Sequence, residues 1–460
     1  MNWALLQNSL LLAGLTTLLS VGFGFLAALW LTGRASCWRN RVLAVAIMAV
    51  VLPPFLVTNC WLDLLGLTGK WRSWLPVNIY SLGGAVWVLT LLTWPITLLL
   101  VWSAWRRLEA AQLESDPALG GGALIRWLLW PMARVAVGQA AVLTFVLALN
   151  NFTVPAILQV KVFPAEVWIQ FNTHLKPVRA LAAAWPLVVA PVLLLIVLRQ
   201  AEMSWPREQG PLAASAFRRQ LGRGWSGFSA MVTGVVLLLS VGLPLAEVVS
   251  SARTWSELPN LLRAVPGVIW NSFAFAAVTA SLCMAVGLAT WRLRAGLVLW
   301  LPFLVPGVMV GLAMIWIFNH PALGLFYGSA AAVIVAFTVR YLAPGWNVVA
   351  HALRGVDRDL TDAARLDGAA GWSLLRHVHW PQIAPQVGAA WYVTYLLCLW
   401  DVETLVLICP PGGETLALRV FNLLHYGHSA QVNALCLLLL ALALAPLLAW
   451  SVVQRLADRR

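Results

Sequence analysis

The sequence predicts an all-α polytopic membrane protein, because of its composition, its long apolar runs and the placement of its basic residues. Residues of the set AVILMFWYC make up 61% of the 460 residues, and charged residues make up only 10%. Soluble domains average about 45–50% apolar and about 25% charged residues, which excludes a protein whose whole surface faces water. Disordered chains are less apolar still, so the composition excludes them as well.

Eleven apolar runs are long enough to cross a bilayer, which takes about 20 helical residues. They lie near residues 9–32, 42–66, 83–104, 135–157, 180–198, 228–250, 268–290, 297–318, 329–350, 386–407 and 431–453. The first run is too long for a cleaved signal peptide, and no basic residue precedes it. The 27 tryptophans also favour a membrane location, because indole rings prefer the interface between lipid and water.

The basic residues predict the orientation of these spans. With the N-terminus outside, 21 of the 30 basic residues lie in inner segments and eight in outer segments, while Arg340 falls within a span. Lys and Arg are enriched on the cytoplasmic side of membrane proteins, so we expect the N-terminus outside and the C-terminus inside. The arginines are scattered between apolar runs and form no basic patch, so we expect no nucleic-acid partner. The six cysteines lack the spacing of a disulfide framework or a zinc site, and we expect no metal.

The two halves of the chain resemble each other, which indicates an internal repeat. The matched segments are Asn8-Ser9-Leu10 with Asn271-Ser272-Phe273, Glu109-Ala110-Ala111 with Asp362-Ala363-Ala364, and Trp130-Pro131 with Trp380-Pro381. Five spans per copy would turn the second copy upside down, so the extra span near 228–250 restores its orientation. We therefore expect two parallel five-helix repeats and one extra span. The expected domains are 1–203 with a cytoplasmic loop near 105–133, a cytoplasmic linker at 204–227, and 228–460 with a loop near 351–384.

The second loop carries the most specific motif in the chain. Asp362-Ala363-Ala364-Arg365-Leu366-Asp367-Gly368 is followed by nine residues and then by Val378-His379-Trp380-Pro381. This segment resembles the EAA loop, E-A-A-x3-G-x9-I-x-L-P, of permease subunits of binding-protein-dependent ABC importers. In that family the loop forms a short coupling helix that docks in a cleft of the ATPase. Two alanines give a thin helix face, the glycine permits a tight turn, and the acid near the helix start favours the N-terminal dipole.

The resemblance implies coupling roles for residues of both loops, which are Glu109, Ala110 and Ala111 in the first copy and Asp362, Ala363, Ala364, Gly368 and Pro381 in the second. The first copy departs from the motif, because it is three residues longer and has Ser115 at the place of the glycine. We therefore expect a weaker or altered dock there. The alternative for either loop is an ordinary amphipathic helix that happens to contain alanine.

The resemblance extends over nearly the whole chain, as two fused permease domains. Residues 410–416, Pro-Pro-Gly-Gly-Glu-Thr-Leu, look like the iron(III)-type branch of the family, which has a thiamine-transporting relative. It implies a multi-pass protein of the bacterial inner membrane that imports ferric iron, thiamine or another small solute. The implied partners are two copies of an ABC ATPase, a periplasmic or lipid-anchored substrate-binding protein, and membrane lipid.

The chain itself is expected to be a transport subunit rather than an enzyme. No Gly-x4-Gly-Lys-Ser/Thr phosphate-binding motif is present in the sequence, so ATP and Mg²⁺ are expected on the separate ATPase, with no cofactor in this chain. An ion-coupled secondary transporter is the alternative, since parallel repeats also occur among such carriers. A membrane scaffold or sensor is a third class, but it gives no reason for the repeat.

Polar residues within the spans are the other candidate site. Arg340 lies in the middle of one span and Asp401 and Glu403 lie in another, while Asn150 and Asn151 stand at the corresponding height of the first repeat. Ionisable groups are costly in the bilayer and usually face a cavity or a partner. These five residues either line a translocation path or hold helices together, by ion pairs in one half and by hydrogen bonds in the other.

Overall fold

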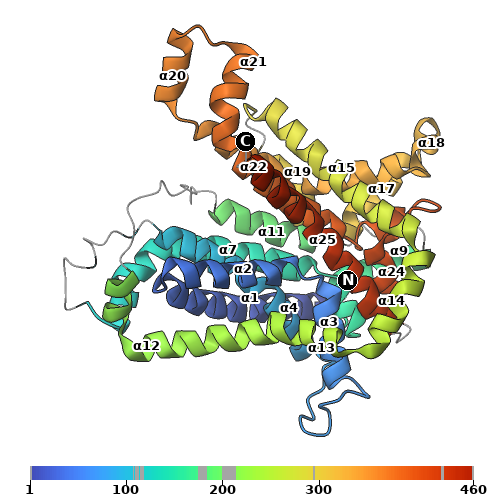
Figure 1. Ribbon diagram of the computed structural model, residues 1–460. Coiled ribbons are helices and arrows are strands. Elements are labelled where there is room, and N and C mark those ends of the chain that lie inside the picture. Colours follow the sequence, from blue (N-terminus) through green and yellow to red (C-terminus); the bar gives the residue numbers. More distant parts are fainter. Residues whose placement is uncertain are drawn as a thin grey trace. The chain divides into compact units, whose positions relative to one another are not determined.

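The computed structural model describes residues 3–106, 108, 113, 119–174, 184–198, 214–293, 296–425 and 429–457. Within these residues all regular structure is helical and no β-strand is present (Figure 1). The chain forms two compact units that do not follow the sequence order strictly. Unit 1 comprises Met1–Glu166, Val189–Leu258 and Leu424–Cys436, and unit 2 comprises Val167–Val188, Pro259–Leu423 and Leu437–Arg460.

Seven helical stretches of the described residues are long and apolar enough to cross a membrane. They are Trp3–Thr32 (α1), Leu82–Trp105 (α4), Gly122–Asn150 (α6, η1 and α7), Ala214–Ser250 (α12, η2 and α13), Pro266–Thr290 (α15), Ala330–Arg354 (α19) and Ala430–Val452 within α25 (Ser429–Ala457). Two bent helix pairs raise this number to nine if each pair is one span. The all-α polytopic class is therefore confirmed for the described residues, with up to nine spans among them rather than the expected eleven.

The two remaining runs differ from expectation. In the run near 180–198, the described helix is α11 (Trp185–Leu198), which has 14 residues, and residues 175–183 lie outside the described ones. In the run near 386–407, helix α22 (Trp380–Leu399) stops at Leu399. The expected continuous span to 407 is therefore wrong, because the helix gives way to a turn at residues 401–404.

Prolines cause the sharp bends of the two helix pairs. Helices α2 (Ser36–Val51) and α3 (Pro54–Leu65) meet at 86°, and α16 (Gly296–Leu304) and α17 (Gly307–Phe318) meet at 111°. Pro53 and Pro306, with ψ of 130° and 141°, precede the second helix of each pair. Proline lacks the amide hydrogen that would continue the helix and disfavours the α conformation of the residue before it.

Among the described residues, three π-helical turns each precede a proline. They are η1 (Ile125–Leu129), η2 (Leu238–Gly242) and η4 (Leu375–His379), and the prolines that follow are Pro131, Pro244 and Pro381. In each turn the residue before the proline donates to the carbonyl five residues back, which gives room to the proline ring that would otherwise clash with a carbonyl of the preceding turn. Because η1 and η4 occupy matching places in the two halves, they support the predicted repeat.

The first helix of each repeat holds a distant segment in the same way. In unit 1, the Ser9 hydroxyl accepts from the backbone N–H of Phe163 at 2.8 Å, the first residue of α9 (Phe163–His174). In unit 2, Ser272 accepts from Leu416 N–H at 2.8 Å, the first residue of α24 (Leu416–His425). Each serine satisfies an amide that has no partner within its own helix. The predicted match of the two Asn-Ser segments thus has a structural basis.

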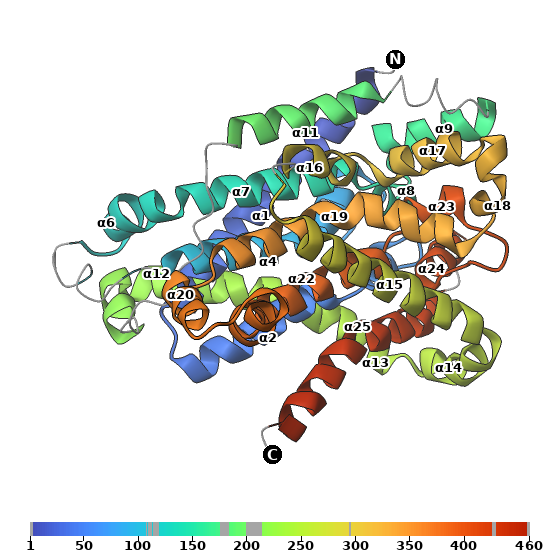
Figure 2. The same ribbon diagram turned by 90° about the horizontal axis from the view of Figure 1, so that it is seen from above.

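The helical cores of the two units are built from the long helices. In unit 1, α1 packs against α4, α7 (Trp130–Asn150) and α12 (Ala214–Leu237), as Figure 2 shows for α1, α4 and α7. In unit 2, α15, α19 and α22 pack against one another. Helix α12 begins inside the expected 204–227 linker, so residues 214–227 are helical except at Gly222.

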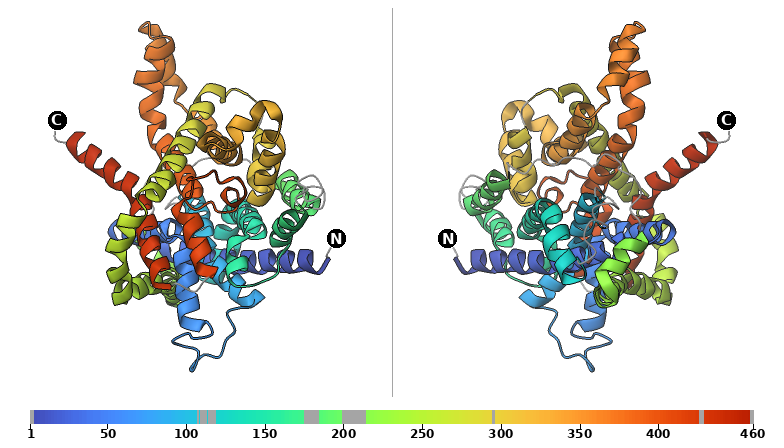
Figure 3. Two further views of the ribbon diagram at one scale, coloured as in Figure 1. Left: turned by 90° about the vertical axis from the view of Figure 1, so that its right-hand side faces the viewer. Right: turned by 90° about the vertical axis from the view of Figure 1, so that its left-hand side faces the viewer.

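Short helices complete the described residues. They are α8 (Thr153–Ile157), α14 (Ala252–Ala264), the 3₁₀ turn η3 (Pro321–Leu323), α18 (Gly324–Tyr327), α20 (Arg358–Leu366), α21 (Gly371–Leu374) and α23 (Leu405–Ile408). Helices α20 and α21 stand clear of the other helices of unit 2, as the orange segment in Figure 3 shows. This exposed hairpin coincides with the second predicted loop.

Candidate functional site

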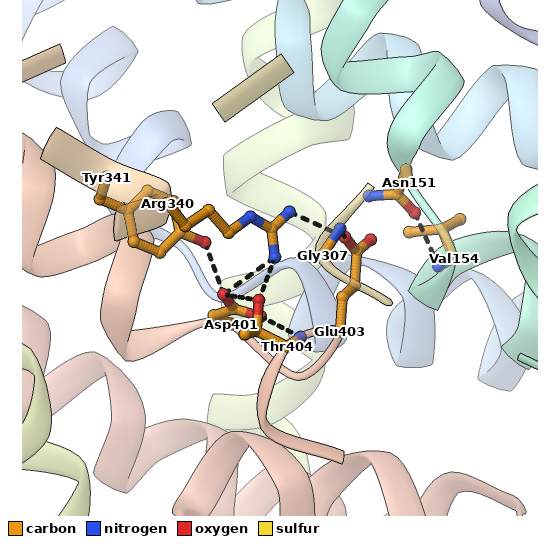
Figure 4. Close-up of polar contacts among 8 residues, drawn as sticks. All are labelled: Asn151, Val154, Gly307, Arg340, Tyr341, Asp401, Glu403 and Thr404. Atoms are coloured by element: carbon orange, nitrogen blue, oxygen red, sulfur yellow. Dashed lines mark hydrogen bonds and ion pairs between the residues drawn. The ribbon is translucent and has the colours of Figure 1, made fainter. Parts of the chain in front are cut away.

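A buried charge cluster joins α19 to the turn after α22 (Figure 4). Arg340 donates from Nη1 to Asp401 Oδ2 at 2.9 Å and to Thr404 Oγ1 at 2.7 Å, and from Nη2 to Glu403 Oε2 at 2.9 Å. Arg340, Asp401 and Glu403 are only 8%, 5% and 8% exposed. Charged groups this deeply buried are costly unless paired and hydrogen-bonded, and here each has such a partner.

Asp401 is held by a turn that ends α22. Its Oδ1 accepts from the Thr404 backbone N–H at 2.9 Å, and its Oδ2 accepts from the Thr404 hydroxyl at 2.8 Å and the Tyr341 hydroxyl at 2.8 Å. An aspartate that bonds the amide three residues later competes with helix continuation, which explains why the helix stops before it. The carboxylate is therefore held by three hydrogen bonds besides the one from Arg340.

Glu403 is placed at the start of another helix. Its Oε2 accepts from the backbone N–H of Gly307 at 3.3 Å, and Gly307 is the first residue of α17. A helix N-terminus carries about half a positive charge and favours an anion there. One guanidinium and one helix N-terminus thus face two carboxylates, which reduces the unbalanced negative charge of the cluster.

Gly307 also makes room for the cluster. A Cβ atom at this position would lie 1.8 Å from Arg340 Nη1 and 2.7 Å from Glu403 Cβ. Both distances are far below van der Waals contact, so the Arg340–Glu403 pair requires glycine here. The sequence analysis missed Gly307, Tyr341 and Thr404 as members of the cluster. The only sequence signals for them were the proline before Gly307 and the spacing of Thr404 three residues after Asp401.

The sequence analysis grouped Arg340, Asp401 and Glu403 correctly but placed the two acids within a span. They lie after the end of α22, in a turn between it and α23. In the first half, Asn150 ends α7 and is 5% exposed, and Asn151 follows it. Asn151 Oδ1 accepts from Val154 N–H at 2.9 Å, the same local turn as that of Asp401 and Thr404. The ion pairs predicted as one alternative are therefore present, and a role in a translocation path stays a prediction.

The second predicted coupling motif forms an exposed helix, α20. None of its residues is buried, and Asp357 is its N-cap, accepting from Asp359 N–H at 2.9 Å. The expectation that Asp362 lies near the helix start is wrong, because α20 begins at Arg358, before the motif. Asp362 instead pairs with Arg365 at 3.2 Å. Ala363 and Ala364 leave this exposed helix thin.

Gly368 forms the predicted turn after α20. Its φ is +85°, a left-handed conformation that is unfavourable for residues with a Cβ atom. A Cβ atom there would meet nothing within 4 Å, so the requirement for glycine comes from the backbone angle and not from a clash. The chain then passes through α21 and η4 to Pro381, near the start of α22.

The first predicted coupling segment is mostly outside the described residues, and this includes Glu109, Ala110, Ala111 and Ser115. The described parts beside it are tied to α12. Leu113 is buried and its carbonyl accepts from the Gln220 side chain, while Gln220 O accepts from Gly121 N–H at 2.8 Å. Among the residues that the structure describes, no three His, Cys, Asp or Glu side chains are grouped to hold a metal ion.

The helical spans define a polytopic membrane protein, and comparisons with known proteins show which proteins it resembles. Residues 278–460 match the family described as binding-protein-dependent transport system inner membrane component. This match and the apolar helices support a multi-pass inner-membrane protein that is similar to permeases of binding-protein-dependent transport systems.

Two relatives illustrate the similarity. The putative 2-aminoethylphosphonate transport system permease protein PhnV of Salmonella paratyphi A is 27% identical over 255 residues, covering 50% of this chain and 94% of the relative. The spermidine/putrescine transport system permease protein PotC of Escherichia coli K12 is 27% identical over 189 residues, covering 40% of this chain and 70% of the relative. Both relatives are named as permease proteins of transport systems.

Proposed function

We propose that this chain supplies two fused permease domains to an ATP-driven importer, which moves a small solute from a periplasmic or lipid-anchored binding protein into the cytoplasm. The observation that carries the proposal is the exposed hairpin of α20 and α21 within the family-matched segment. Leu366 is 89% exposed and Trp372 is 72% exposed there, which suits a surface that a partner covers. Two copies of an ABC ATPase are the proposed partners, and they would bind the ATP and Mg²⁺.

Helix α22 offers a route from this hairpin to the charge cluster. It starts at Trp380, next to the hairpin, and ends at Leu399, two residues before Asp401. Its 20 residues extend over about 30 Å. We infer that a movement of α20, driven by the ATPases, displaces the turn that carries Asp401 and Glu403. Asp362, Ala363, Ala364, Gly368 and Pro381 would act in coupling, and Glu109, Ala110 and Ala111 in the first loop.

A glycine substitution tests the coupling role. Gly368→Val should force the +85° backbone angle to change and so move α20, while the buried spans stay intact. We expect a loss of ATPase co-purification and of substrate-stimulated hydrolysis in reconstituted membranes, with normal binding-protein contact. Ser115→Val, at the matching step of the first loop, should do much less. No loss from Gly368→Val would contradict the proposed dock, and equal large losses would show that both loops couple alike.

The proposed orientation has the N-terminus outside, the C-terminus inside and two parallel repeats. Single cysteines at Gln220 and Ser256 should then react with impermeant reagents from opposite sides of the membrane. Cys37 has to be replaced in the background, because it is an exposed free thiol. Labelling of both sites from one side would contradict the parallel repeat.

The solute is the least constrained part of the proposal. Residues 410–416 favour ferric iron, with thiamine as the next candidate, and the relatives' names add 2-aminoethylphosphonate and polyamines for comparison. Ligand binding to the purified binding protein, followed by uptake in proteoliposomes, ranks these solutes. Uptake that runs on an ion gradient without the ATPase would instead favour a secondary transporter.

A further inference from the structure

A cationic cavity of about 520 Å³ lies in unit 1, where α1 ends and α12 begins. Four arginines line one part of it, namely Arg34, Arg218, Arg219 and Arg223. Small residues of the next turns of α12 line the other part, namely Ser226, Gly227 and Ala230. Figure 1 shows α12 running alongside α1. The cavity thus joins a charged end to a shallow helix face.

The start of α12 has two different sides. Phe217 and Leu221 are buried, and Phe217 packs next to Gly33, where an added Cβ would lie 3.4 Å from its ring. Arg218 and Arg219 are exposed on the same two turns. Gly222, with φ of +79°, then interrupts the helix before the apolar span begins. This pattern is typical of a helix segment that lies at a membrane interface.

The four arginines have no counter-charge in the structure as described. Among the described residues, none of them forms an ion pair with a carboxylate. The Arg34 guanidinium lies over the Trp30 ring at 4.7 Å, which holds it in place. Burial and the nearby charge of Arg218 both lower the pKa of Arg34. Like charges around one cavity favour an anion within it.

We propose that this cavity binds an anionic phospholipid of the cytoplasmic leaflet, with the headgroup phosphate among the arginines and an acyl chain along Ser226, Gly227 and Ala230. The positive-inside prediction places this end of α1 and α12 on the cytoplasmic side, where anionic lipids are attracted by basic residues. Added Cβ atoms at Gly227 and Gly234 would meet nothing within 4 Å, so the helix face continues as open space into the span. A soluble anion needs only the arginines, whereas a lipid uses both parts of the cavity.

The headgroup end is tested with the purified chain in detergent, by native mass spectrometry with phosphatidylglycerol and with phosphatidylcholine. The wild type should retain phosphatidylglycerol preferentially. Each arginine near a membrane surface contributes about five-fold in affinity, so Arg218→Gln with Arg219→Gln should lower retention about 25-fold. Arg292→Gln is the matched control, because Arg292 also lies over a tryptophan, Trp291 at 5.2 Å, just after the first helix of the second repeat. An equal loss in the control would overturn the proposal.

The acyl-chain end is tested with a pair of glycines. Gly227→Leu fills the cavity, whereas Gly224→Leu adds the same side chain at a position that does not line it, and neither added Cβ meets another atom within 4 Å. We expect Gly227→Leu to lower phosphatidylglycerol retention several-fold and Gly224→Leu to leave it unchanged. Competition by millimolar inorganic phosphate, combined with no effect of Gly227→Leu, would show a soluble-anion site and overturn the lipid proposal.

Discussion

The turns after α7 and α22 share one backbone design, but only the second is charged. Asn151 in the first half and Asp401 in the second each accept from the backbone N–H three residues later, both at 2.9 Å. Two residues further on, the first half has Thr153 where the second has Glu403. Four residues before the proline inside α4 stands Leu91, whereas Arg340 occupies this place in α19. The turn of the first half therefore forms without charged side chains. Arg340, Asp401 and Glu403 are not needed to form such a turn.

The bent helix pairs show the same asymmetry. The first pair has Pro54 at the start of its second helix, and the second pair has Gly307. Pro54 has no amide hydrogen and does carry a Cβ atom. Gly307 supplies an N–H to Glu403 and leaves room for Arg340. One difference between the halves thus extends over three separate elements, which indicates that they act as a unit.

The largest expected effect comes from removing the one cation of the cluster. Arg340→Met leaves Asp401 and Glu403 buried without their partner, and breaking a buried pair in this way costs about 3–5 kcal/mol. The thermal unfolding temperature in detergent and the yield of folded protein should both fall. If the cluster also lines the path, transport per folded molecule falls as well. Unchanged yield together with unchanged uptake would contradict both roles.

A variant with a neutral second half distinguishes the role of the charges from the role of the turn. The triple variant Arg340→Leu, Asp401→Asn and Glu403→Thr gives this half the residues of the first. Because a whole buried ion cluster can be replaced at little cost, we expect stability near that of the wild type. Transport equal to that of the wild type would show that the charge cluster is structural. A stable variant without transport would assign the cluster to the translocation path.

The next effect concerns Gly307. Gly307→Ala brings a carbon into the space of Arg340 Nη1 and Glu403 Cβ, and overpacking of this kind costs about 1–3 kcal/mol. Gly14→Ala in α1 is the matched control, since its added carbon meets nothing within 4 Å. Alanine favours a helix over glycine, so the control should be neutral or slightly stabilised. Equal melting temperatures for the two variants would mean that the cluster shifts without cost.

A smaller asymmetry is expected for the Asn-Ser anchors. Asn271 donates to Gly412 O at 2.7 Å and to Glu414 O at 3.2 Å, whereas Asn8 donates to one acceptor among the described residues, Lys161 O at 3.3 Å. Removing a hydrogen-bonding partner of this kind costs about 1–2 kcal/mol, less where the bond is long and exposed. Asn271→Ala should therefore lower the unfolding midpoint more than Asn8→Ala. Equal shifts or the reverse order would show that the second bond of Asn271 adds no stability.

Much of the fold was predictable, because straight spans have a clear sequence signal. The runs at 83–104 and 268–290 became helices Leu82–Trp105 and Pro266–Thr290, within two residues at each end. The bends at Pro53 and Pro306 were not predicted, because a bent pair has the same average hydropathy as a straight span. The end of α22 was missed for a different reason, since the apolar run resumes at Leu405 after the acids of the turn.

The candidate site was predictable as a set of residues and not as a geometry. Charge within a span singled out Arg340, Asp401 and Glu403, because ionisable groups are rare there. Gly307 gave no such signal, since glycine is common in transmembrane helices and its function here is to leave space. The Gly368 turn was predictable from the motif, and the structure adds that its backbone angle is the reason for glycine.

The smallest effect should come from the neutral turn itself. Asn151→Ala removes the acceptor for Val154 N–H at the start of α8, and the loss of such a cap costs about 1 kcal/mol. Asn151→Asp keeps the acceptor but adds a half-buried charge, and the first half has Leu91 where the second has arginine. We therefore expect Asn151→Asp to be less stable than Asn151→Ala at neutral pH and to recover as the carboxyl is protonated in acid. Melting temperatures of the two variants between pH 4 and 8 give the measurement. If the Asn151→Asp variant is as stable as the wild type across this range, the first half can also hold a charge at this turn. The difference in charge between the two turns would then not depend on a nearby arginine.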